Sequence, residues 1–219
     1  MKHILGASVL ALLLAACGNE TTVDDTPAAP TPPEVEADAG DTVAEPTEVE
    51  AEYTVETALA GEWRTAEERA RDQYRHPVET LEFFGIEGDD TVIEVWPGGG
   101  WYTNVIAPWL NANGGQFIAA VVSPDRSERA AQALAAYQAN YEAYPDTFGV
   151  IEYTYYDAES GPLGAADSVD AVLTFRNLHN WMSGDHDDKF FADAYAVLKP
   201  GGVLGVVEHR LPSAREQDP

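Results

Sequence analysis

The sequence contains a single cysteine, Cys17, among its 219 residues. One cysteine excludes both a disulfide within the chain and a cysteine-rich zinc site. Basic residues are also scarce: the sequence has 12 lysines and arginines but 38 acidic residues, which gives a formal net charge of -26. Such a charge repels phosphate backbones and acidic lipid headgroups, so no nucleic acid is expected as a partner.

No apolar run in the sequence is long enough to span a bilayer comfortably. The run over residues 4–14 follows the positive charge of Lys2 near the N-terminus. A short apolar run behind a positive start is typical of an export signal that is cleaved, rather than of a transmembrane anchor. We therefore predict a signal peptide over residues 1–16.

The segment Leu14-Ala15-Ala16-Cys17 resembles the bacterial lipobox. This resemblance implies that Cys17 is lipidated and becomes the mature N-terminus, although an ordinary signal with a chance cysteine is the alternative. Several acyl chains hold a protein stably on a membrane, so the lipid anchor would be its only membrane contact. Gly18 stands where inner-membrane retention signals carry Asp, which implies an exported lipoprotein of the bacterial envelope, on the outer membrane and facing the periplasm.

Residues 17–56 have the composition of a tether. They include five prolines, many acidic residues and no Lys or Arg. A segment of this kind cannot bury enough apolar surface to offset the entropy of ordering it. We predict an acidic disordered tether here, and a folded domain over residues 57–219.

In the folded domain, β-branched and apolar runs alternate with segments of helical periodicity. The expected strands are the run that begins at Thr91, Gln116–Val122, Val150–Tyr156, Ser168–Phe175 and Val203–Val207. The expected helices are Trp63–Arg75, Val78–Phe84, Trp101–Leu110, Asp125–Tyr141 and Asp185–Leu198. This alternation predicts a three-layer α/β fold with a mainly parallel sheet and right-handed crossovers. Ligands of such sheets bind at the carboxyl ends of the strands.

The segment Thr91–Trp101 organises the rest of the domain. A strand with Glu94 near its end is followed by Gly98, Gly99 and Gly100, and then by a helix. Glycines allow the backbone to approach a ligand closely, and the helix start offers free N–H groups to a negative group. The segment therefore indicates a nucleotide-binding loop, and a plain strand-to-helix turn is the alternative.

From this loop onward the chain resembles the class I S-adenosylmethionine-dependent methyltransferases, with a Rossmann-like fold. Glu94 matches the acidic residue of the first motif of that family, and Gly98 and Gly100 match its last two glycines. Trp96 departs from the pattern, because it stands where the family usually has its first glycine. The segments Trp96–Tyr102 and Arg176–Trp181 also resemble a WPGGGWY loop and an RNLHNW segment that mark a group of predicted bacterial methyltransferases.

The resemblance implies S-adenosylmethionine as the cofactor and assigns its binding residues. Val121 stands where the family usually has a ribose-binding acid, so weak binding is expected. Asp157-Ala158 matches the pair near the adenine amino group. The implied cofactor-binding residues are Glu94, Trp96, Pro97, Gly98, Gly99, Gly100, Val121, Asp157, Ala158 and Thr174. The region of Arg71, Arg75 and His76 often caps the cofactor pocket in the family, but a solvated face that packs on the sheet edge is the alternative.

Three residues after the fourth strand are the candidate catalytic residues that would act on the methyl acceptor: His179, Asn177 and Arg176. Histidine is the side chain most easily placed as a general base near neutral pH. The alternative is that His179 caps the next helix or packs under Trp181. His186 lies among aspartates, but an acidic helix start explains that cluster, so the sequence predicts no metal site.

The resulting prediction is an exported, lipid-anchored S-adenosylmethionine-dependent methyltransferase that binds a small-molecule ligand. Its methyl acceptor and its oligomeric state stay open. The alternative is a non-enzymatic envelope lipoprotein that uses the fold to bind a ligand or partner. Family members usually have seven strands, so we expect the sheet to be cut short after strand five and the chain to be a truncated version of a longer domain.

Overall fold

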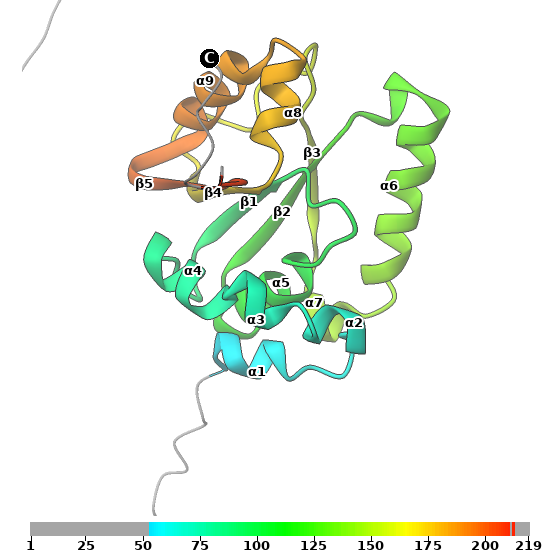
Figure 1. The fold of residues 1–219 in the computed structure, drawn as a ribbon, viewed down its shortest axis with the longest axis vertical. Coiled ribbons are helices and arrows are strands. Elements are labelled where there is room, and N and C mark those ends of the chain that lie inside the picture. The colour runs from blue at the N-terminus through cyan, green and yellow to red at the C-terminus, as the bar shows by residue number, and fades with distance from the viewer. Residues whose placement is uncertain (1–52, 211, 213–219) are drawn as a thin grey trace, which may run out of the picture. The chain divides into compact units, whose positions relative to one another are not determined.

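The computed structural model describes residues 53–210 and residue 212 (Figure 1). The predicted signal peptide, Cys17 and most of the predicted tether lie outside these residues. Among the residues that the structure describes, no helix is both long and apolar enough to cross a membrane.

The described part of the domain is built on a sheet of five parallel strands in the order β3-β2-β1-β4-β5. The strands are β1 (Thr91–Val95), β2 (Gln116–Val121), β3 (Glu152–Tyr155), β4 (Val169–Phe175) and β5 (Leu198–Val207). The predicted parallel sheet is therefore confirmed. The chain order reverses between β1 and β4, and this switch point is where ligands of open α/β sheets bind.

Both faces of the central strand are buried, which explains its run of apolar residues. Val92 packs into one apolar cluster and Ile93 into the other, because successive side chains of a strand point to opposite faces. The first cluster receives Ile106 and Leu110 from α5 (Thr103–Asn113). The predicted three-layer α/β fold, with helices on both faces of the sheet, is thus confirmed.

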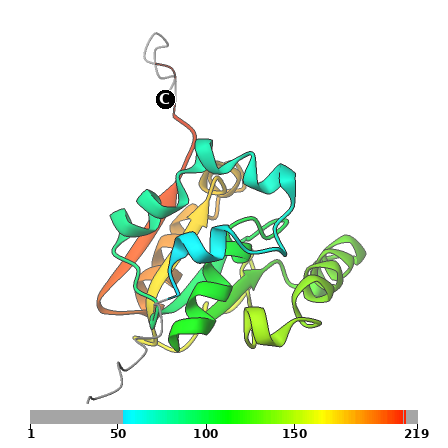
Figure 2. The same ribbon diagram turned by 90° about the horizontal axis from the view of Figure 1, so that it is seen from below.

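The two layers are formed by different sets of helices (Figures 1 and 2). The face of α5 is also covered by α1 (Val55–Leu59), α4 (Pro77–Phe84), α7 (Pro145–Phe148) and the aromatic side of α6 (Glu128–Tyr141). The opposite face is covered by α8 (Leu178–Ser183) and α9 (Asp187–Val197). The first layer therefore draws on helices from before β1 to before β3, whereas the second is formed by the two helices between β4 and β5.

Two of the predicted helices are interrupted. The helix predicted over residues 63–75 is split into α2 (Ala66–Arg69) and α3 (Asp72–Arg75), because Thr65 caps one turn and the chain turns again before Asp72. The helix predicted from Asp125 is preceded by the short 3-10 helix η1 (Pro124–Arg126). Ser127 then has extended backbone, and its hydroxyl accepts the Ala130 amide at 3.1 Å, so the α-helix starts after this second cap.

Residues 199–202, which separate the expected helix from the expected fifth strand, belong to strand β5 in the structure. Leu198 already pairs with Val169, and a register shift follows before Val203 pairs with Ala171. The one proline and two glycines of this segment are accommodated by this irregularity in the ladder. The prediction that β5 begins at Val203 is therefore wrong by five residues.

Candidate functional site

The glycine loop after β1 begins with a residue in a left-handed conformation. Trp96 has a φ of 54°, a region that non-glycine residues seldom adopt. Its indole Nε1 donates to the Tyr156 carbonyl at 2.9 Å, and its ring meets the edge of Trp181 at a centroid distance of 5.4 Å. The backbone conformation explains why glycine suits this position, and the indole contacts explain how tryptophan is held there.

Glu94 is buried at the end of β1, where it is 2% exposed. The Thr103 hydroxyl donates to its carboxylate at 3.0 Å, and the Tyr137 hydroxyl lies 2.7 Å from the same Thr103 oxygen. Burial raises the pKa of Glu94 to about 7, although the hydrogen bond from Thr103 and the charge of Arg75 oppose this rise. Glu94 can therefore change its protonation state near neutral pH.

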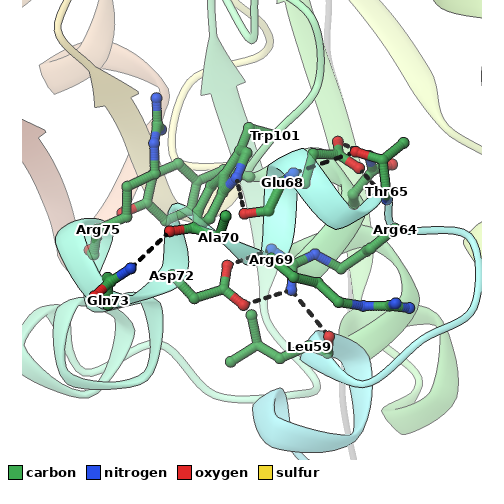
Figure 3. Close-up of polar contacts among 12 residues, drawn as sticks. Leu59, Arg64, Thr65, Glu68, Arg69, Ala70, Asp72, Gln73, Arg75 and Trp101 are labelled. Atoms are coloured by element: carbon green, nitrogen blue, oxygen red, sulfur yellow. Dashed lines mark hydrogen bonds and ion pairs between the residues drawn. The ribbon is translucent and has the colours of Figure 1, made fainter.

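The short helices α2 and α3 form a cap beside Trp101, the residue that follows the glycine loop (Figure 3). The buried Arg64 guanidinium donates to Asp72 at 2.9 Å and to the Leu59 carbonyl at 2.9 Å. The Trp101 indole donates to the Glu68 carbonyl in α2 at 3.1 Å. The Arg64 bonds tie the cap to the segment before it, and the Trp101 bond joins the cap to the residue that follows the glycine loop.

The cap brings Arg71 and Arg75 to the glycine loop. The Arg75 guanidinium lies over the Trp101 ring, with Cζ 4.5 Å from the ring centre, and the Tyr102 hydroxyl donates to the Arg75 carbonyl at 3.2 Å. Burial and the neighbouring charges of Arg71 and Arg176 lower the pKa of Arg75. Since these like charges gather at one place in an acidic chain, they favour an anion there.

Asn177 ties the ends of two strands together. Its side-chain amide faces the carbonyls of Val95 and Trp96 at 3.2 and 3.1 Å and the Thr174 hydroxyl at 3.1 Å. Arg176, just before it, has a φ of 62°, and its amide donates to the Val207 carbonyl at 2.7 Å. Asn177, which was predicted to act at the methyl acceptor, thus holds the glycine loop, whereas Arg176 is exposed.

Two cavities share several residues of the glycine loop, and a third touches it at Gly99. The first has a volume of about 380 Å³, and the second about 340 Å³. Trp96, Pro97, Gly98 and Asn177 line both cavities, so the loop forms their shared wall. The first continues along Val121, Val122, Ser127, Arg129, Ala130, Ala133, Leu134 and Tyr137. The second continues along Glu68, Arg71, Arg75, Glu94, Gly99, Trp101, Tyr102, Phe175 and Arg176.

Some of the residues predicted to bind the cofactor lie outside these linings. Gly100 is buried against Tyr141, and Thr174 is buried with its hydroxyl donating to the Val95 carbonyl at 3.1 Å. Asp157 is 7% exposed, and its Oδ2 atom has no hydrogen-bond partner among the described residues. Ala158, beside it, is exposed.

His179 lies away from both linings and meets a residue that the sequence analysis did not single out. Its Nδ1 is 3.0 Å from a carboxylate oxygen of Glu208, which directly follows β5. The rule that functional groups gather at strand ends could have found Glu208. Tyr137 and Arg129 were also missed, and helical periodicity alone gives no signal for them.

Comparisons with known proteins agree with this architecture. Residues 94–206 match the family described as "Methyltransferase domain". A SAM-dependent methyltransferase from Aquifex aeolicus is 20% identical, with a TM-score of 0.50 over 68% of this chain and 72% of that one. A search of curated protein sequences finds no significant match.

Two further solved structures are larger than the part they share with this chain. A protein from Bacillus halodurans is 24% identical, with a TM-score of 0.49 over 64% of this chain and 53% of that one. An arsenic(III) S-adenosylmethionine methyltransferase from Chlamydomonas reinhardtii is 20% identical, with a TM-score of 0.46 over 73% and 51%. The chain therefore spans about half the length of these two proteins. Because the family match extends over half of the sequence and includes the glycine loop, the chain belongs to the methyltransferase domain family.

Proposed function

We propose that this chain binds S-adenosylmethionine across the two cavities and transfers its methyl group to a small-molecule acceptor. The observation that carries the proposal is the pair of cavities that share the glycine loop as a wall. S-adenosylmethionine has an adenosine end and an amino-acid end, and a ligand of this shape would place one end on each side of the loop. The Aquifex relative, which is described as a SAM-dependent methyltransferase, supports the same choice.

The charges of the second cavity suit the amino-acid end of the cofactor. Arg71, Arg75 and Arg176 line it beside Glu94. A carboxylate accepts charge-assisted hydrogen bonds from guanidinium groups, and an ammonium group donates to a carboxylate. A zwitterion would therefore find both of its partners here, and its ammonium group would favour the ionised form of Glu94.

The first cavity suits the adenosine end, with one exception. Val121 and Leu134 provide apolar walls, and no carboxylate is among its lining residues. The ribose hydroxyls would therefore lack the acidic partner that the family usually provides. Asp157, the residue that the resemblance assigns to the adenine amino group, does not line this cavity.

Catalysis in this arrangement would rest on alignment. S-adenosylmethionine supplies an electrophilic methyl group when it is bound. Asn177 and Thr174 hold the ends of β1 and β4 in register, and Trp96 fixes the loop between the cavities. Holding donor and acceptor in line can supply much of the barrier reduction for such a displacement.

Calorimetry with S-adenosylmethionine and the 219-residue chain tests the proposal. The wild type should bind weakly, and Val121→Asp should bind about tenfold to a hundredfold more tightly, because one charge-assisted hydrogen bond contributes about 1.5–3 kcal/mol. Val150→Asp is the matched control, since Val150 is 83% exposed and lines neither of the two cavities. Equal effects of the two substitutions would contradict the placement of the ribose.

The same protein samples distinguish the methyltransferase from the non-enzymatic alternative. If folded wild-type and Val121→Asp proteins both fail to bind S-adenosylmethionine, the chain uses its fold for another ligand or partner. Binding, followed by methyl transfer to candidate acceptors in the presence of the labelled cofactor, supports the enzyme. The acceptor itself is left to that screen.

We also propose that the protein is exported and lipid-anchored in the bacterial envelope, on the outer membrane and facing the periplasm. The lipobox-like segment that ends at Cys17 supports this proposal. Cys17→Ser should move the protein from the membrane fraction to the soluble fraction or leave it unprocessed. An unchanged mature mass and an unchanged membrane partition would contradict lipidation.

A further inference from the structure

We propose that His179, Glu208 and His209 form a binding site for a divalent transition-metal ion of the Zn²⁺ class. His179 lies in the first turn of α8, which follows β4, and Glu208 and His209 follow β5 directly. None of the three lines either cavity that contains Asn177. The site therefore lies outside the linings of the proposed cofactor site, and it adds a metal to a chain whose sequence predicts none.

The spacing of the donor atoms is close to that of a metal site. The ligand atoms of the three residues all lie within 4.8 Å of one another. The His179 Nδ1 atom is 3.0 and 3.1 Å from the two oxygens of Glu208. Metal–ligand bonds of about 2.1 Å place neighbouring ligands about 3.0–3.4 Å apart, so this pair already has the spacing of two ligands on one ion.

His209 can complete the set by a rotation of its side chain. Its ring centre is 5.3 Å from that of His179, and both rings are exposed. An exposed imidazole can turn without displacing core residues, so the remaining adjustment is confined to the surface. Exposure also leaves room for water on the ion, as in zinc sites that keep an open position.

The backbone beneath the cluster is fixed. Phe175 at the end of β4 pairs with Val207 at the end of β5, and the Arg176 amide donates to the Val207 carbonyl at 2.7 Å. Glu208 follows Val207 directly, and its carboxylate also accepts the His209 amide at 2.9 Å. Glu208 and His209 thus continue a strand end that is hydrogen-bonded to the segment after β4, and His179 lies in the helix that follows that segment, which limits the entropy lost when an ion binds.

The donor types select the class of metal. Two imidazoles and one carboxylate form the set found in His₂Glu zinc sites and in two-histidine, one-carboxylate iron sites. Mg²⁺ and Ca²⁺ prefer oxygen ligands, so they should compete poorly. A simple ion pair between protonated His179 and Glu208 is the competing explanation, but it assigns no role to His209.

Metal binding can be measured on the 219-residue chain carrying Cys17→Ser, which removes its only thiol. Calorimetry with Zn²⁺, and visible absorption with Co²⁺, should show one saturable site per chain that tolerates excess Mg²⁺. Glu208→Gln and His209→Ala should each weaken Zn²⁺ binding at least tenfold, since even outer-shell changes cost about 10–100-fold.

His76→Ala is the matched control, because His76 is exposed and lies 3.8 Å from the Glu79 carboxylate without a second histidine. It should leave the affinity unchanged, and circular dichroism should show that every variant is folded. The proposal is overturned if the wild type shows no saturable Zn²⁺ site. It is equally overturned if folded Glu208→Gln and His209→Ala proteins bind as tightly as the control.

Discussion

Replacement of Glu94 by glutamine should make the protein more stable at high pH, and the gain should disappear in acid. Burial raises the pKa of Glu94 from 4.5 to about 7 in the folded state. The folded carboxyl group therefore binds its proton more tightly than the unfolded one, and stability is lost as the pH rises through this window. At 1.36 kcal/mol per pKa unit, the loss from Glu94 amounts to about 3 kcal/mol.

The measurement is urea unfolding of the wild type and Glu94→Gln at several pH values from 4.5 to 8. Glutamine keeps an oxygen that accepts the Thr103 hydroxyl, which now donates at 3.0 Å, and it cannot ionise. All other carboxylates are common to both proteins, so their titration cancels in the difference. The free energy of unfolding of Glu94→Gln, relative to wild type, should rise by about 3 kcal/mol from pH 4.5 to 8. A difference that does not depend on pH would refute the assignment of this pKa to Glu94.

Two further substitutions test the packing of the site by urea unfolding. Gly100→Ala should cost about 2–4 kcal/mol, because its new Cβ would lie 1.8 Å from the Tyr141 hydroxyl at a positive φ, whereas Gly114→Ala meets no atom and should cost about 1–2 kcal/mol. Equal losses would show that Tyr141 moves aside freely. Asp72→Asn should cost about 2–3 kcal/mol, because it leaves the buried Arg64 guanidinium without its charged partner, and an unchanged midpoint would contradict that role.

The parallel sheet could be predicted from the sequence because its signals are local and strong. The apolar run at Thr91, the glycines that follow it and the alternation with helices all indicate the same layered sheet. Element ends were less predictable, since they depend on tertiary contacts. Ser127, for example, restarts a helix that an alanine-rich pattern alone would continue from Asp125.

The candidate site was predictable where the family pattern names its residues, in the loop and at the strand ends. Pro97 and Gly98 line both cavities as the motif predicts, and Val121 lines the first. The side chains that come from α6 were not visible, because no spacing in the sequence brings Arg129 or Tyr137 to the first cavity. The pairing of His179 with Glu208 depends on the register of β4 against β5, which no local pattern specifies.

The two sequence segments that resemble the predicted bacterial methyltransferases form one structural unit. The Asn177 amide of the second segment donates to the Trp96 carbonyl of the first at 3.1 Å, and the rings of Trp96 and Trp181 meet at 5.4 Å. Trp96 needs these contacts because its left-handed backbone costs about 1–2 kcal/mol relative to glycine. Tryptophan at this position therefore requires the partner segment, and the loss of either segment should leave the other without its support.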